Sequence, residues 1–126
     1  MKEVICEEVA QETLSGWLSE LEAELTVESR ATLIKRIKTG RLDYADSVFT
    51  LGLIVPVKLE NGSILDKITI SEPNGKMVAD ISKRKSSDEE AALRLISTLS
   101  GQPLGVIERI GQRDLNAAAV VLSFFG

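Results

Sequence analysis

Residues 49–71 read FTLGLIVPVKLENGSILDKITIS and decide the fold, because two alternating apolar and polar runs flank an Asn-Gly pair. Alternation with a period of two is typical of a strand with one buried face. Asn61 and Gly62 both tolerate positive φ, and such a pair between alternating runs is the strongest short-range signal for a β-hairpin. The stretch therefore predicts two antiparallel strands joined by a tight turn.

The register of this hairpin follows if Asn61 and Gly62 alone form the loop. The apolar residues expected on one face then make three cross-strand pairs, Leu59 with Ile64, Val55 with Ile68, and Leu53 with Ile70. Pro56 has no N–H to donate to a sheet, so we expect it at an edge or a bulge. Residues 41–44 are a candidate third strand, turning at residues 45–47.

Residues 4–40, which precede the sheet, show helical spacing. Apolar residues recur at steps of three and four at Leu14, Trp17, Leu18, Leu21 and Leu25. Gly16 weakens the middle of this helix, which we expect to break or bend there. Thr26 is the predicted N-cap of a second helix, with Leu33, Ile34 and Ile37 inward and Gly40 as its stop.

Residues 74–126, which follow the sheet, are predicted to be helical again. We expect a short helix over residues 75–84, with Met77, Val78 and Ile81 inward. A capping box from Ser87 to Glu90 starts a second helix, which Gly101 ends. A short turn of helix at residues 104–110 precedes a final helix capped by Asp114.

The predicted fold class is therefore α+β, with an N-terminal helical pair, a central β-hairpin or three-stranded antiparallel meander, and a C-terminal helical bundle. The corresponding segments are residues 1–40, 41–73 and 74–126, with one compact domain from about residue 30. The length fits a single domain.

The composition favours a cytoplasmic protein. Cys6 is the lone cysteine, which excludes an internal disulfide and suits a reducing compartment. The longest apolar run, residues 117–125, is far shorter than the roughly 20 residues that a transmembrane helix needs, and the N-terminus has no signal-peptide pattern. The net charge of −4 argues against general affinity for nucleic acid or anionic membranes.

The sequence shows no arrangement of residues that is typical of a catalytic site. The chain has no histidine, so Cys6 has no histidine base to activate it. The carboxylates that could form an acid–base pair lie at expected helix starts or on exposed faces, at Glu7, Glu8, Asp88, Glu89 and Glu90. Asp43 and Asp46 alone do not make a calcium loop. We therefore expect no enzyme activity, no catalytic residue, no cofactor and no metal.

A basic run near the middle of the chain leaves one alternative open. Its members are Arg30, Lys35, Arg36, Lys38 and Arg41. They form either the solvated face and cationic end of the second helix or a surface for duplex DNA, as in a small regulator. Duplex binding that weakens steeply with salt would distinguish the second interpretation.

The final helix is apolar on every side, since residues 117–125 contain one polar residue. Such a helix lies either at the centre of a core or against another chain. Because a small domain has little material to cover both sides, we favour a partner or self-association surface. The predicted partner-binding residues are Leu104, Val120, Val121, Phe124 and Phe125.

Four segments in order resemble a known family. They are the hairpin residues 56–62 (PVKLENG), residues 68–73 (ITISEP), residues 95–103 (LISTLSGQP), and Arg113-Asp114-Leu115 ahead of the terminal Phe124-Phe125. This order is similar to that of the tail assembly chaperones of Mu-like and related contractile-tailed phages. The resemblance covers about residues 30–126.

The resemblance implies an assembly factor that acts in the bacterial host cytoplasm during virion morphogenesis and is not part of the virion. Chaperones of this kind coat the tape measure protein and deliver tail tube protein subunits onto it, so these two proteins are the expected partners. Many are made in two lengths by ribosomal frameshifting, and this chain would be the short form. A permanent structural tail protein of a phage or prophage is the remaining alternative.

Overall fold

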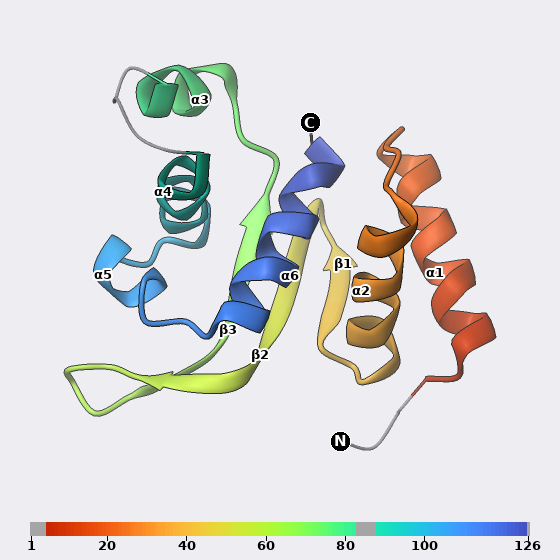
Figure 1. Ribbon diagram of the computed structural model, residues 1–126, viewed down its shortest axis with the longest axis horizontal. Coiled ribbons are helices and arrows are strands. Elements are labelled where there is room, and N and C mark those ends of the chain that lie inside the picture. The colour runs from red at the N-terminus through yellow and green to blue at the C-terminus, as the bar shows by residue number, and fades with distance from the viewer. Residues whose placement is uncertain (1–4, 83–87, 126) are drawn as a thin grey trace.

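The computed structural model describes residues 5–82 and 88–125, and Figure 1 shows their arrangement. The fold is α+β, as predicted. The elements in chain order are α1 (Glu7–Glu20), α2 (Val27–Lys38), β1 (Leu42–Ala45), β2 (Val48–Lys58), β3 (Ile64–Ser71), α3 (Gly75–Ser82), α4 (Asp88–Ser100), α5 (Leu104–Ile107), α6 (Gln112–Leu122) and a terminal 3₁₀ turn η1 (Ser123–Phe125). None of the described helices is both long and apolar enough to cross a bilayer.

The described strands form one antiparallel sheet in the order β1-β2-β3. The candidate third strand is confirmed, because β1 pairs with β2 from Leu42 opposite Leu51 to Ala45 opposite Val48. Asp46 and Ser47 form the two-residue connection, and both have positive φ. Positive φ at both loop positions marks a type I′ turn, whose twist matches that of the strands it joins.

The predicted register of the β2–β3 hairpin is wrong, and the turn supplies the first reason. Gly62, at φ +88°, donates its N–H to the carbonyl of Leu59, and the N–H of Leu59 donates to the carbonyl of Ser63. The loop therefore has three residues, a common solution with glycine in the left-handed position. Lys58 consequently pairs with Ile64. One residue of slip exchanges the faces on which side chains lie.

A β-bulge supplies the second reason. The register shifts between Gly52 and Val57, so that residues 53–56 of β2 lie opposite a single residue of β3. Pro56 falls inside this bulge, as its missing N–H predicts. Two residues expected on the buried face consequently point outward, since Val55 is 55% exposed and Ile64 is 58% exposed.

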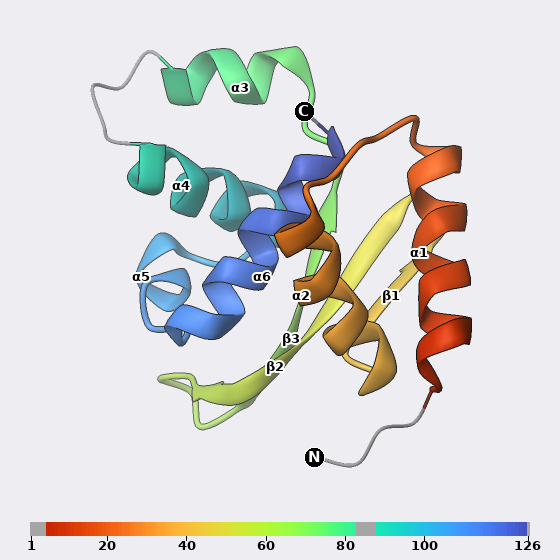
Figure 2. The same ribbon diagram turned by 45° about the vertical axis from the view of Figure 1, so that its right-hand side comes forward.

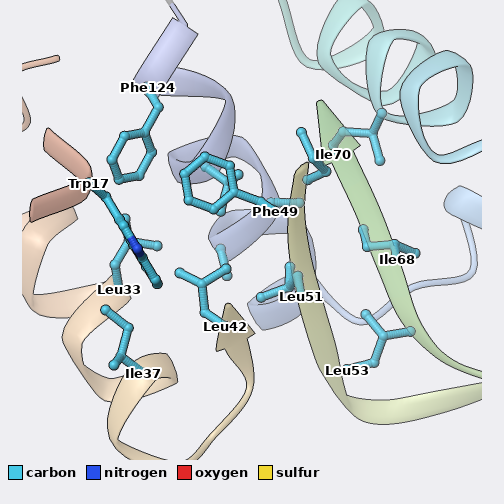
Figure 3. Packing of buried hydrophobic residues seen from close by; sticks show 14 of the residues in the cluster. Trp17, Leu33, Ile37, Leu42, Phe49, Leu51, Leu53, Ile68, Ile70 and Phe124 are labelled. Atoms are coloured by element: carbon cyan, nitrogen blue, oxygen red, sulfur yellow. The ribbon is translucent and has the colours of Figure 1, made fainter. Parts of the chain in front are cut away.

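The core lies between the sheet and the helices α1, α2 and α6 (Figure 2). Leu51 opposite Ile68 and Phe49 opposite Ile70 form its β layer. Figure 3 shows Phe49 and Leu51 pointing to the side on which the helical residues Trp17, Leu33, Ile37 and Phe124 lie. The rings of Trp17 and Phe49 meet edge to face with centroids 5.6 Å apart.

The N-terminal helices follow the sequence closely. Thr26 caps α2 by accepting a hydrogen bond from the N–H of Ser29 at 3.1 Å, and Gly40 follows the helix end with φ +71°. The expected break at Gly16 is wrong, since α1 continues through this exposed position to Glu20. A glycine costs about 1 kcal/mol in a helix, and packing of the apolar face overrides that cost.

The C-terminal helices match the sequence-based prediction in part. Gly101, at φ +73°, ends α4, and α5 forms within the segment expected to turn. Asp114 is not the cap of α6, because the helix already begins at Gln112 with Gly111 at the N-cap. The predicted cap Ser87 lies outside the described residues, as do the side chains of Val78 and Ile81.

Candidate protein-binding surfaces

The final helix is mainly a core element, which corrects two of the partner-binding predictions. Val121 is fully buried and Phe124 is 4% exposed. Val120 and Phe125 are half-buried against the core, and Leu104 is half-buried at the start of α5. Of the two interpretations of an all-round apolar helix, the central position therefore holds for Val121 and Phe124.

The position of α6 explains this burial. The helix lies on the sheet, against β2 and β3, and α2 packs along its side (Figure 2). The ring of Phe49 from β2 contacts Phe124 and Phe125, with centroid distances of 4.8 Å and 5.9 Å. The residues of one small chain thus cover most of a helix for which the sequence suggested a second chain.

A buried ion pair fixes α6 in this position. Nη1 of Arg36 on α2 donates to Oδ1 of Asp114 at 2.8 Å, and both side chains are almost fully buried. The remaining bonds complete the network: Arg36 also donates to the carbonyls of Gly52 and Arg113, and the carboxylate of Asp114 accepts the N–H groups of Ile54 and Val55 at 3.0 to 3.3 Å.

This network pairs the backbone donors of the β-bulge. Ile54 and Val55 lie within the register shift, and their N–H groups donate to Asp114, since unpaired donors away from water are costly. Asp114 replaces the missing strand, and Arg36 balances its charge. The arrangement is saturated with protein partners and buried, so it stabilises the fold and presents no free reactive group. In the sequence, the only sign of this network was Asp114, which the sequence pattern predicted to be an ordinary N-cap of the final helix.

The basic run does not form one continuous surface. Arg36 is buried, and Arg41 donates to the carbonyl of Leu53 at 2.8 Å. Lys38 lies 3.7 Å from the carboxylate of Glu7. Arg30 and Lys35 remain exposed on α2. The DNA-binding alternative therefore loses the central residue of its proposed face.

Exposed residues of α6 line a groove between α4 and α6. Its volume is about 240 Å³. Its apolar lining comes from Ala92, Leu93 and Ile96 on α4 and from Leu115 and Ala119 on α6. Glu89, Gln112 and Asn116 supply the polar lining. None of these residues is on the list predicted from the sequence, although the helical spacing of Leu115 and Ala119 was visible there.

Two further hollows lie elsewhere on the molecule. One, of about 490 Å³, separates the loop of the β2–β3 hairpin from α5, where Arg109 donates to the carbonyl of Lys58 at 2.6 Å. The other, of about 550 Å³, runs between α1 and α2. Among the described residues, no group of three or more acidic or cysteine side chains is arranged to hold a metal ion.

No protein-family model, curated protein or solved structure matches this chain.

Proposed function

We propose that this chain is a protein-binding assembly factor of the phage tail assembly chaperone kind. The order of segments from the hairpin to Phe124-Phe125 supports the family, and the α4–α6 groove supports the mode of binding. On this proposal the groove takes a helix of the tape measure protein. The tail tube protein is the second expected partner, and no chemistry is required of the chain.

The groove carries the proposal because its shape and lining suit a helix. Apolar residues at helical spacing on α4 and α6 line it, flanked by the amides of Gln112 and Asn116 and by one carboxylate, Glu89. An amphipathic helix binds such a groove through apolar anchors at steps of three and four. The small side chains of Ala92 and Ala119 allow a third helix to approach closely.

Co-expression with the tape measure protein of the same gene cluster tests this proposal. The chain should be retained on the tagged tape measure protein. Ala119→Arg should reduce retention at least tenfold, because Ala119 is exposed and a long charged side chain there fills the groove. Ser123→Arg is the matched control, since Ser123 is exposed on the same end of the chain and does not line the groove.

Two results would contradict the proposal. If the wild-type chain is not retained, the chain does not bind the tape measure protein. If Ala119→Arg and Ser123→Arg are both retained like wild type, the groove is not the binding site. Phe124 is unsuited to this test because its replacement would act on the core.

A further inference from the structure

The groove between α1 and α2, of about 550 Å³, has an apolar half and a charged half. Leu14 and Leu18 from α1 and Val27, Ala31 and Ile34 from α2 form the apolar half. Val27 is 80% exposed, the highest value for a large apolar side chain in the described chain.

The two helices that bound this groove carry opposite charges. Every ionisable side chain of α1 is a glutamate, at Glu7, Glu8, Glu12 and Glu20. On the groove side of α2 the charged residues are basic, at Arg30, Lys35 and Lys38. Glu8 shares its helical face with Gln11 and Ser15, which line the groove, so it lies on the α1 rim. The groove therefore has one acidic rim and one basic rim.

The helices run antiparallel, with the charged ends together. The start of α1 lies beside the end of α2, as the Glu7–Lys38 contact of 3.7 Å and the hydrogen bond from the N–H of Ile5 to the carbonyl of Lys38 show. At the other end, Leu18 of α1 and Val27 of α2 line the same part of the groove.

We propose that a second copy of this chain occupies the groove and that the two helical pairs form a four-helix bundle. A twofold axis parallel to the helices places α1 of each copy over α2 of the other, antiparallel as within one copy. The acidic rim of each copy then meets the basic rim of the other, with Glu8 near Lys35. The apolar halves meet at Val27 and Leu18. Such self-complementarity is what an isologous interface requires.

This occupant fits better than an unrelated helix because each rim finds its counter-charge on the same chain. The α1–α2 pair, which bounds this groove, lies on the opposite side of α6 from α4, which bounds the other groove (Figures 1 and 2). Self-association at α1–α2 therefore leaves the α4–α6 groove free for the tape measure protein. It goes beyond the proposed function and can be measured on the purified chain alone.

Sedimentation equilibrium of the full chain, from about 1 μM to several hundred μM, tests the proposal. The average mass should rise from 13.7 kDa toward twice that value. Val27→Asp should weaken association at least tenfold, because it places a charge in the apolar half. The fold should remain, since an acidic residue in the first turn of a helix is favourable.

Val9→Asp is the matched control. Val9 is also an exposed valine in the first turn of a helix, but it does not line the groove. Its replacement adds the same charge and should leave association unchanged.

A charge exchange sharpens the result. Glu8→Lys and Lys35→Glu should each weaken association, and the double variant should restore it toward wild type. Both changes oppose a helix dipole, so loss of helix stability would make the double variant worse than either single one. Recovery in the double variant therefore reports the intermolecular contact.

Two outcomes would overturn this inference. The first is a mass of 13.7 kDa at all concentrations. If the Val27→Asp variant of that monomer also loses the tape measure protein, that protein is the occupant of the groove. The second is equal association of Val27→Asp and Val9→Asp.

Discussion

The final helix α6 and the N-terminal pair α1–α2 use apolar residues in opposite ways. Residues 117–125, at the end of α6 and in η1, carry apolar side chains on every side, yet the chain itself covers Val121 and Phe124. The α1–α2 pair is amphipathic, yet it leaves Val27 exposed beside an open groove. The apolar content of a helix thus indicates how much apolar surface must be buried. Its position in the fold decides whether the same chain or another chain covers that surface.

Polar contacts account for part of this difference. The α6 helix is held to α2 by the buried Arg36–Asp114 pair, and to the sheet by the bonds from the β-bulge donors to Asp114. The corresponding contact in the N-terminal pair, Lys38 with Glu7, is longer and largely exposed at the glutamate. Screening by water makes such a pair worth little. Of the N-terminal pair, α2 therefore shares the buried network through Arg36, whereas α1 relies mainly on packing.

Asp114→Ala should give the largest effect and would break the C-terminal side of this comparison. It leaves the guanidinium of Arg36 buried without its counter-charge and removes the acceptor of the Ile54 and Val55 N–H groups. Removing one partner of a buried pair costs about 3 to 5 kcal/mol, and the lost acceptors favour the upper end. Urea unfolding measures the change.

Glu7→Gln is the control for that experiment, because it removes the exposed pair. Its cost should stay below about 1 kcal/mol. Equal effects of the two variants would show that the buried network does not hold α6.

Phe124→Ala and Phe125→Ala should differ from each other. Phe124 is buried, so its truncation should cost about 3 to 4 kcal/mol, and Phe125 is half-buried, so its truncation should cost about 1 to 2 kcal/mol. Thermal or urea unfolding of the purified chain measures both. A smaller effect at Phe124 than at Phe125 would restore the interpretation of Phe124 as a surface anchor.

Apart from the Glu7→Gln control, Thr26→Ala should give the smallest of these effects, on the N-terminal side. It removes the acceptor of the Ser29 N–H at the start of α2 and should cost about 1 kcal/mol. Thr26→Ser keeps an acceptor and should cost less. Circular dichroism during urea unfolding measures both, and an unchanged stability in Thr26→Ala would show that the cap is not needed.

Local signals in the sequence predicted local structure well. The cap at Thr26, the stops at Gly40 and Gly101, and the position of Pro56 in a bulge all depend on backbone chemistry within a few residues. The strand register failed because Asn-Gly supports both two- and three-residue loops, and nothing local indicated a bulge.

The partners of Asp114 and Phe124 lie far away in sequence, and this explains the errors at the candidate site. Asp114 bonds to Arg36, 78 positions earlier. Phe124 contacts Phe49, which is similarly far away along the chain. Helical spacing cannot reveal such pairs. The α1–α2 groove could have been found only in part, from the opposite charges of its two helices.

Hydrogen exchange on the free, dilute chain tests most directly whether α6 belongs to the core. The amides of residues 117–121 should exchange only through global unfolding, with the free energy that urea unfolding gives, and those of α1 should open more easily. Exchange of residues 117–121 at free energies well below the global value would contradict the account, because α6 would then need a partner chain to be held in place.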